Sequence, residues 1–283
     1  MSDVPRCSSF VDEPLPGTAA TETGWLCIEA AGGWSRDVLK GDTFDPATSA
    51  AIREFAQRNA LRVLLIRRPG RVPPPSGRAV FIASSVPGRS RLRRFTVMDY
   101  ADIPALDPEG GDVAGPVALV CAHGKRDVCC AVGGRPVAAA LAGCYADPVV
   151  WECSHTGGHR FAPVLIVLPT GYTYGRVTGE SAKAVFDAAR AGYVVPDSLR
   201  GRSSTSAAGQ VAEVAVRGVL GPAPVEALAV AADGDRARVT HVDGRAWDVT
   251  VASERLSPRP PSCGKTDKAA KAWRVTDMRA VQR

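Results

Sequence analysis

The sequence contains no apolar run that approaches the roughly 20 residues needed to cross a membrane as a helix. Apolar runs such as residues 164–168 fall far short of that length. The first residues also lack the basic and apolar segments of a secretory signal peptide. We therefore expect a cytoplasmic protein with no membrane partner. With 45% apolar and 23% charged residues among 283, the chain can bury the cores of two or three domains.

Lysine is scarce, since 29 of the 35 basic residues are arginine, and ten of these arginines lie between residues 55 and 98 without an acidic residue. Two interpretations of the arginine-rich region, residues 58–94, remain open. It is either a solvated face or a docking surface for an acidic redox protein, bound by complementary charge. Aromatic residues are sparse there and no nucleic-acid-binding motif is present, so nucleic acid is not the favoured partner.

Histidine is also rare, and its distribution follows that of cysteine. Five of the eight cysteines and three of the four histidines lie between residues 121 and 159. In a chain without a secretion signal, this number of cysteines indicates metal or redox chemistry rather than a disulfide framework. Cys144 and the three cysteines outside this range, Cys7, Cys27 and Cys263, are interpreted as packing residues.

The order of predicted elements is similar in two successive segments. In the first, strands are predicted at 24–30, 61–68, 79–84 and 91–97, with a helix at 47–59. In the second, strands are predicted at 116–121, 149–154 and 163–169, with helices at 135–143 and 179–192. Strand, helix, strand, strand, helix is the order of a thioredoxin-like lobe.

We predict an α/β (α+β) chain made of tandem thioredoxin-like lobes and a small C-terminal α+β module. The boundaries are 1–101 for the first lobe, 102–115 for a linker, 116–200 for the second lobe and 205–283 for the module. A helix at 209–221 and a three-stranded meander fill most of the module. The Pro- and Lys-rich tail from residue 257 is expected to be partly irregular.

Two loops of the second lobe carry the cysteine and histidine residues. The segment C-A-H-G-K-R-D-V-C-C (121–130) follows one predicted strand, and S-H-T-G-G-H-R-F (154–161) follows another. Sites in open α/β sheets collect at the carboxyl ends of strands, so these loops are expected to meet. Between the histidines, Gly157 and Gly158 disfavour a helix and favour a loop whose backbone approaches a ligand closely.

Two thiolates and two imidazoles suit an iron–sulfur cluster, zinc or copper. Zinc fingers usually space their cysteines two to four residues apart, whereas eight residues separate Cys121 from Cys130. This wide spacing favours a two-iron cluster, and zinc remains an alternative.

These segments, together with W-E-C-S-H-T-G-G-H-R-F-A-P (151–163) and Y-G-R-V (174–177), resemble the sucrase/ferredoxin-like family of thioredoxin-like ferredoxins. An N-terminal C-S-S-F and a late S-C-G-K (262–265) are also similar to that family. The resemblance implies a 2Fe–2S cluster held by a cysteine pair eight residues apart and a histidine pair three residues apart. The implied ligands are Cys121, Cys130, His155 and His159.

The resemblance thus implies an electron carrier with a 2Fe–2S cofactor, and candidates to surround the cluster are Ser154, Gly157, Gly158 and Arg126. Two alternatives stay open: a zinc-stabilised scaffold using the same four side chains, and a thiol–disulfide oxidoreductase working through Cys129 or Cys130. Cys129 is either a substitute ligand or a free thiol. Sucrose hydrolysis is not favoured, because it needs two carboxyl groups flanking a sugar bond and nothing in the sequence indicates that Asp127 and Glu152, the two in this region, both face a sugar cleft.

Overall fold

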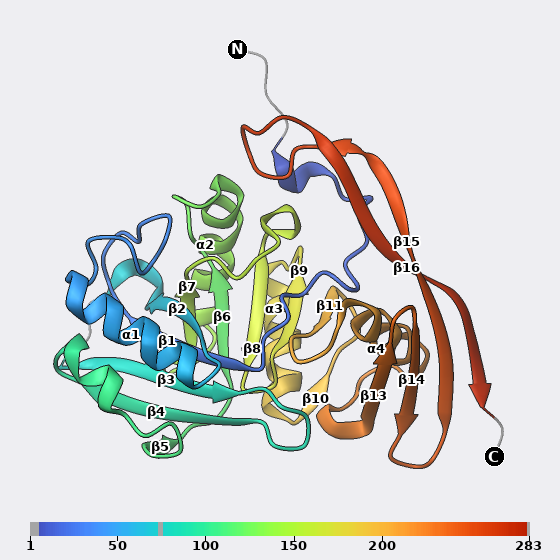
Figure 1. Ribbon diagram of the computed structural model, residues 1–283, viewed down its shortest axis with the longest axis horizontal. Coiled ribbons are helices and arrows are strands. Elements are labelled where there is room, and N and C mark those ends of the chain that lie inside the picture. The colour runs from blue at the N-terminus through green and yellow to red at the C-terminus, as the bar shows by residue number, and fades with distance from the viewer. Residues whose placement is uncertain (1–5, 73–75, 282–283) are drawn as a thin grey trace.

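A ten-stranded mixed sheet runs through residues 24–202 of the computed structural model, which describes residues 6–72 and 76–281 (Figure 1). Its strand order is β11-β9-β8-β6-β7-β2-β1-β3-β4-β5. The N-terminal half consists of β1 (Gly24–Glu29), α1 (Pro46–Arg58), β2 (Arg62–Arg67), β3 (Arg78–Ser84) and β4 (Arg91–Val97). The second half consists of β6 (Val117–Cys121), α2 (Val128–Ala142), β7 (Val150–Cys153), β8 (Val164–Leu168), β9 (Tyr172–Gly175), α3 (Gly179–Arg190) and β11 (Leu199–Arg202).

The two halves repeat one pattern of strand pairing. In the first, β1 pairs in parallel with β2 and antiparallel with β3, which pairs antiparallel with β4. In the second, β6 pairs in parallel with β7 and antiparallel with β8, which pairs antiparallel with β9. An antiparallel contact between β2 and β7, with Ile66 opposite Cys153, joins the halves into one sheet. The mixed α/β class predicted from the sequence is confirmed.

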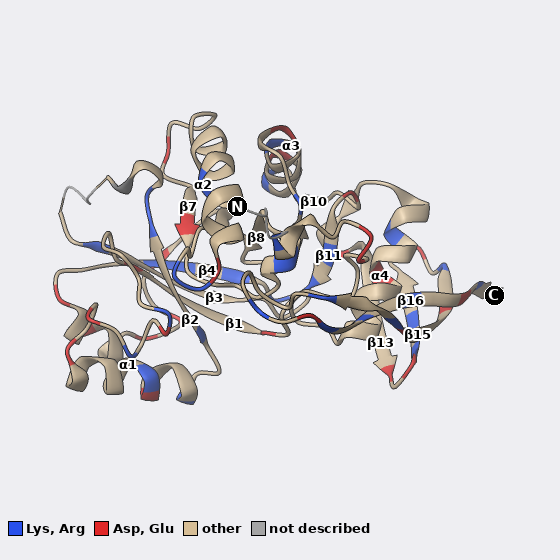
Figure 2. Cartoon of the chain, turned by 90° about the horizontal axis from the view of Figure 1, so that it is seen from above, with Lys and Arg blue, Asp and Glu red and all other residues tan. Residues whose placement is uncertain are grey.

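Side chains alternate between two layers of core along each strand, as the period of two in an extended chain requires. In β1, Trp25 and Cys27 face a core shared by both halves, whereas Leu26 and Ile28 pack toward α1. In the second half, α2 and α3 cover a separate core. Figure 2 shows the result: α1 lies on one side of the strands and α2 and α3 lie on the other.

The structure corrects the predicted helix at 135–143. Helix α2 begins at Val128, where the side chain of Asp127 accepts a hydrogen bond from the backbone N–H of Cys129, and it contains Pro136 in its interior. The prediction placed Pro136 near the first turn of the helix, a position that proline prefers. Tertiary packing overrides that preference here, as the site shows below.

The segment predicted as a linker carries regular structure. It contains most of the 3₁₀ helix η3 (Tyr100–Ala105), where Ile103 is fully buried, and the short strand β5 (Asp112–Val113). Strand β5 pairs antiparallel with β4, so this segment forms the edge of the large sheet.

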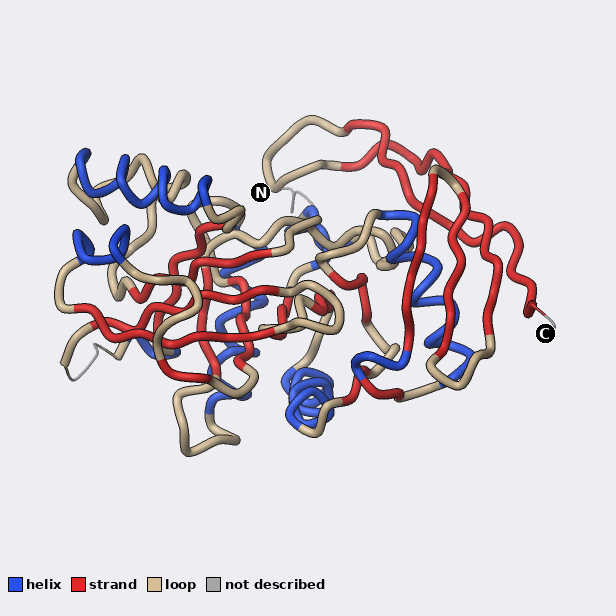
Figure 3. The backbone as a smooth tube through the Cα atoms, turned by 60° about the horizontal axis from the view of Figure 1, so that its bottom comes forward, coloured by secondary structure: helices blue, strands red, loops and turns tan. Residues whose placement is uncertain are grey.

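The C-terminal module packs α4 (Ala207–Leu220) against a four-stranded antiparallel sheet of order β13-β14-β15-β16. Its strands are β13 (Leu228–Asp233), β14 (Arg236–His241), β15 (Ala246–Arg259) and β16 (Lys268–Val281). Residues 260–267 of the tail are irregular, as expected, but most of the tail is strand β16, which pairs along β15. The hairpin made by β15 and β16 reaches back to the N-terminal segment (Figure 3).

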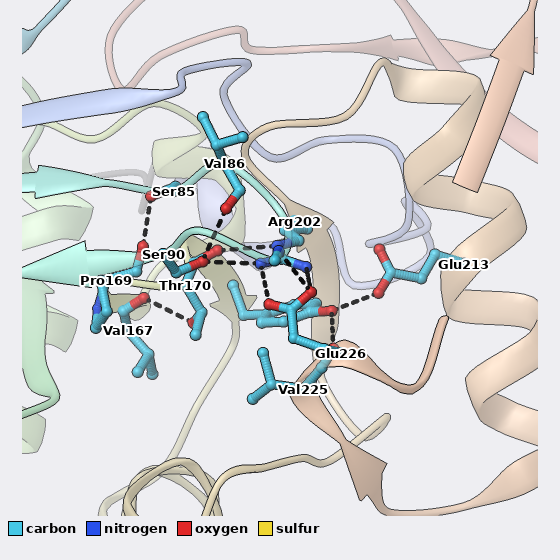
Figure 4. Close-up of polar contacts among 12 residues, drawn as sticks. Ser85, Val86, Ser90, Val167, Pro169, Thr170, Arg202, Glu213, Val225 and Glu226 are labelled. Carbon is cyan, nitrogen blue, oxygen red and sulfur yellow. Dashed lines mark hydrogen bonds and ion pairs between the residues drawn. The ribbon is translucent and has the colours of Figure 1, made fainter. Parts of the chain in front are cut away.

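An ion-pair and hydrogen-bond network around the buried Arg202 fixes this module to the sheet (Figure 4). Arg202, at the end of β11, binds the carboxylate of Glu226 at 2.8 Å and donates to the carbonyl of Thr170 and the hydroxyl of Ser90. One guanidinium therefore joins the β3–β4 turn, the β8–β9 turn and the module. Among the described residues, no helix has the length and apolar character needed to cross a membrane.

Candidate metal centre

The parallel pair β6 and β7 places the first two donor segments side by side. Cys121, the last residue of β6, is the register partner of Cys153, the last residue of β7. The chain then continues from β6 into the start of α2, which carries Cys130, and from β7 into the loop with His155. Carboxyl ends of parallel neighbours meet at one edge of a sheet, so these loops converge as the sequence predicts.

Three of the four predicted ligands are in mutual reach. The sulfur atoms of Cys121 and Cys130 and a ring nitrogen of His155 all lie within 4.8 Å of one another. The Cys130 sulfur is 3.9 Å from Nδ1 of His155. Both cysteines are buried, at 1% exposure each, whereas His155 is half-buried. Two soft sulfur donors and an imidazole in this arrangement could hold a metal ion.

Gly134 allows helix α2 to approach the strand that carries Cys121. A Cβ atom at this position would lie 2.0 Å from the carbonyl oxygen of Cys121, a distance that no side chain tolerates. The same helix turn presses Gly133 against the ring of Pro163. Gly133 and Gly134 therefore allow α2 to pack closely enough to bring Cys130 to Cys121.

The Gly157–Gly158 loop has the shape that the sequence indicates. Both residues have positive φ angles, +94° and +73°, which side-chain-bearing residues rarely adopt. Arg200, which is 1% exposed, donates to the carbonyl of Gly157 at 3.3 Å and packs where a Cβ of Gly158 would lie. Arg200 thus holds the loop between the two histidines, a role that no local sequence signal revealed.

His159 lies next to His155 but faces a different group. The two rings stack with centroids 5.3 Å apart. Nε2 of His159 donates to the carbonyl of Pro261, and Nδ1 lies 3.7 Å from a carboxylate oxygen of Asp127. This Nδ1 is buried without a hydrogen-bond partner among the described residues. A histidine that donates one ring N–H to a carbonyl and keeps the other nitrogen free has the arrangement usual for a metal ligand.

His123 orients His155. It is 2% exposed, and its Nδ1 accepts a hydrogen bond of 3.2 Å from the backbone N–H of His155. Ser154 is equally buried and accepts the backbone N–H of Leu65 at 3.0 Å, which ties the loop to β2. Neither residue is among the three mutually close donors, and both act on the position of the loop that carries His155.

A shallow depression of about 240 Å³ opens beside His155. Three arginines line it, Arg36, Arg62 and Arg126, together with His123, Ser154 and Asp37. Arg126, which we predicted near the cluster, is exposed at this rim. The depression is therefore a basic surface with one histidine of the candidate centre in its wall.

The comparison with known families now has a structural context. A family model described as Sucrase/ferredoxin-like matches residues 15–201, well over half of the 283 residues. The chain belongs to the sucrase/ferredoxin-like family. No curated protein and no solved structure matched it. The segment matched by the family model contains all four predicted ligands.

The family name includes sucrase, and the two carboxylates of the region bear on it. Glu152 is 4% exposed and forms an ion pair of 2.7 Å with Arg67. Asp127 accepts hydrogen bonds from the hydroxyl of Ser262 and the backbone N–H groups of Cys129 and Cys263. Both carboxylates are thus held by ion pairs or hydrogen bonds to neighbouring groups of the protein.

The family segment contributes only one of the three cysteines in a second cluster. Cys129 points away from its neighbour Cys130, and its sulfur lies 3.1 Å from that of Cys263 and 3.6 Å from that of Cys7. Together with Asp127, these residues form a second group of metal-binding donors within 4.8 Å of one another. We had interpreted Cys7 and Cys263 as packing residues, because nothing local in the sequence links positions 256 residues apart.

The charges of the centre reflect burial and pairing. A hydrogen bond from Cys130 and the nearby His155 lower the pKa of Cys121, and the same hydrogen bond together with burial raises the pKa of Cys130. Burial lowers the pKa of both His123 and His159, so their neutral, metal-binding forms are favoured. Burial acts to raise the pKa of Asp127, but the hydrogen bonds from Ser262, Cys263 and Cys129 have a larger combined effect, so the pKa of this carboxyl lies below its usual value.

Proposed function

We propose that the chain is an electron-transfer protein that holds a 2Fe–2S cluster through Cys121, Cys130, His155 and His159. The observation that carries this proposal is the convergence of Cys121, Cys130 and His155 within 4.8 Å, with His159 stacked on His155. Family membership adds weight, because the four residues fall in the matched segment.

The donor set suits this cofactor. The two cysteines come from different segments, β6 and α2, and both sulfurs are buried. Burial lowers the pKa of His159 and so favours its neutral, metal-binding form. Such a cluster supplies reversible one-electron transfer, and two neutral imidazoles in place of thiolates raise its potential. His123 and Arg200 keep the His155 loop in position, and the buried walls keep water from the sulfur donors.

We propose that an acidic redox partner docks at the depression lined by Arg36, Arg62 and Arg126. His155 is half-buried in its wall and so connects the centre to this surface. In the wider arginine-rich region, residues 58–94, five arginines form ion pairs: Arg58 with Glu54 of its own helix, and Arg62, Arg67, Arg68 and Arg91 with acids from other parts of the chain. Of the three arginines at the depression, Arg62 is thus paired with Glu22. Lys and Arg are spread over the whole chain in Figure 2.

A reducing compartment such as the cytoplasm fits this function. All eight cysteines, each within the described residues, are free, and seven of them are at least partly buried. Persistent free thiols are typical of cytoplasmic proteins.

The test is anaerobic purification followed by iron and sulfide analysis and by visible and electron-paramagnetic-resonance spectra of the reduced protein. We expect equal amounts of iron and acid-labile sulfide in the wild type, loss of both in Cys130→Ala, and an altered reduced spectrum in His155→Ala. Cys144→Ala is the matched control, because Cys144 is exposed and its sulfur contacts only the carbonyl of Ala140.

Other results would select a different function. Zinc without iron, lost in Cys130→Ala, would indicate a zinc-stabilised scaffold using the same side chains. A colourless, metal-free protein whose Cys129 and Cys130 thiols react together would indicate a thiol–disulfide oxidoreductase. The latter has less structural support, because the two sulfurs belong to different clusters.

A further inference from the structure

The second cluster brings together three sulfurs from widely separated parts of the chain. Cys7 belongs to the N-terminal 3₁₀ helix η1 (Cys7–Ser9), Cys129 to the first turn of α2, and Cys263 to the loop between β15 and β16. Their sulfur atoms form a triangle with sides of 3.1, 3.6 and 3.6 Å. Both oxygens of the Asp127 carboxylate lie 3.6 Å from the Cys7 sulfur.

We propose that Cys7, Cys129 and Cys263 bind one Zn²⁺ ion, with Asp127 as the fourth donor. The ion fastens the N-terminal segment and the loop between β15 and β16 over the candidate metal centre. The assignment is independent of the electron-transfer proposal, since it uses none of the four ligands named there.

The size of the triangle points to a single ion. With zinc–sulfur bonds of about 2.3 Å, tetrahedral geometry separates neighbouring sulfurs by about 3.8 Å, close to the observed sides. Three sulfurs in mutual contact leave no room for a cluster of several irons between them. A disulfide is the other possibility for Cys129 and Cys263, but it requires sulfurs about 2.05 Å apart and leaves Cys7 without a partner.

The cysteine triangle is held in place by contacts that do not involve the ion. Arg259, at the end of β15, binds Asp12 through two hydrogen bonds of 3.0 and 2.9 Å. Arg160 binds the buried Glu13 in the same two-pronged manner at 3.0 and 2.7 Å. These pairs fix the N-terminal segment against the hairpin and against the loop after His159, so the site is organised before any ion binds.

Zinc binding at this site needs no oxidant or reductant. Zn²⁺ keeps its oxidation state, three S–H bonds release their protons to solvent, and three zinc–sulfur bonds form. The carboxylate of Asp127 is already ionised, because the hydrogen bonds it accepts from Ser262 and Cys263 favour the charged form.

The site would control access to His159. The carbonyl of Pro261, two residues before Cys263, accepts the ring N–H of His159. The loop between β15 and β16 lies next to the N-terminal segment in Figure 1. Fastening this loop through Cys263 therefore holds Pro261 over His159, and releasing it exposes that histidine.

The test measures zinc per chain by elemental analysis of protein purified with reductant and without chelators. Four cysteine variants are compared: Cys263→Ser, Cys7→Ser, the double variant Cys121→Ser/Cys130→Ser and the control Cys144→Ser. We expect one zinc per chain in the wild type, in Cys144→Ser and in the double variant, and less than a tenth of that in Cys263→Ser and Cys7→Ser. Iron content stays unchanged in Cys263→Ser, which separates this site from the first.

A second measurement covers the case of poor folding. Cobalt added to the metal-free Cys121→Ser/Cys130→Ser protein should give the visible bands of tetrahedral, sulfur-ligated Co²⁺, and the same protein with Cys263→Ser should not. Asp127→Asn, which preserves a helix-capping side chain, should weaken zinc binding by at least about tenfold. Zinc that persists in Cys263→Ser but leaves in the double variant would overturn the proposal. So would a zinc-free wild type with a Cys129–Cys263 disulfide in its intact mass, or one that gives no tetrahedral cobalt spectrum.

Discussion

The two sulfur clusters contain adjacent residues, Cys130 in the first and Cys129 in the second, but are assembled from very different lengths of chain. The first uses donors between residues 121 and 159, from two loops that follow neighbouring parallel strands. The second joins Cys7 to Cys263 across most of the sequence. Strand pairing and the close packing of α2 on β6 bring the first set together, whereas the second set needs the N-terminal segment, α2 and the C-terminal hairpin to be in place.

The comparison teaches how one helix start can serve two sites. Successive residues in a helix point about 100° apart, so the neighbours Cys129 and Cys130 face different directions. Cys130 faces the core formed by β6 and β7, and Cys129 faces the small cluster with Cys7. Asp127 caps the same helix and touches both His159 and Cys7.

The largest expected effect comes from moving helix α2 as a whole. Gly134→Val places its Cβ against the Cys121 carbonyl and should destabilise the protein by about 3 kcal/mol. Because Cys129 and Cys130 move together, iron and zinc should both be lost in elemental analysis. Gly143→Ala in the same helix is the control, since its nearest neighbours would lie at an ordinary 3.6 Å. A Gly134→Val protein that retains both metals would show that α2 does not set either site.

The second-largest expected effect should change zinc binding without changing iron binding. Arg259→Gln removes the two-pronged contact with Asp12, so the hairpin loses a tie to the N-terminal segment. We expect zinc affinity to fall about tenfold or more while iron content stays constant. Competition with a chelator of known affinity measures the zinc affinity. Arg274→Gln on the same hairpin removes only an exposed ion pair with Glu254 and should change neither. Equal effects of both variants would mean that the Asp12 contact is not specific to the site.

Zinc removal should have a moderate effect on the hairpin loop. Lys265 and Lys268 are exposed in or beside this loop, so trypsin can report its opening. Chelation of the wild type should speed cleavage there by about tenfold, because a released loop opens locally more often. Cys263→Ser should be cleaved at the fast rate with or without chelator. Identical rates for wild type with and without chelator would contradict a fastening role.

The smallest effect concerns the basic depression of the first cluster. Replacing the exposed Arg36 and Arg126 by serine should slow oxidation of the reduced protein by ferricyanide about two- to fivefold at low salt, since charge complementarity speeds encounter. The difference should vanish at high ionic strength and be absent with a cationic oxidant. Arg279→Ser, on strand β16, should leave the rate unchanged. Stopped-flow spectroscopy of the cluster absorbance measures each rate.

Most regular elements could be predicted from local pattern. Apolar runs bounded by Gly and Pro located the strands of the large sheet, and capping residues located α1 and α3. The start of α2 and strand β16 were missed for a common reason. Pro136 favoured a later start for the helix, and the Pro- and Lys-rich composition of the tail favoured irregular structure. Tertiary contacts outweigh both local preferences, with Cys121 in the first case and with strand β15 in the second.

The sequence by itself determined the donor types, their grouping between residues 121 and 159, and the strand ends on which they lie, because these depend on neighbours in the chain. Only the tertiary structure decided that Cys129 turns toward Cys7 and Cys263 and that His159 faces Asp127 and Pro261. Those contacts depend on where the C-terminal hairpin ends in space, and closing a long loop costs little more entropy than closing a short one. Sequence separation therefore gives no hint of which cysteines meet.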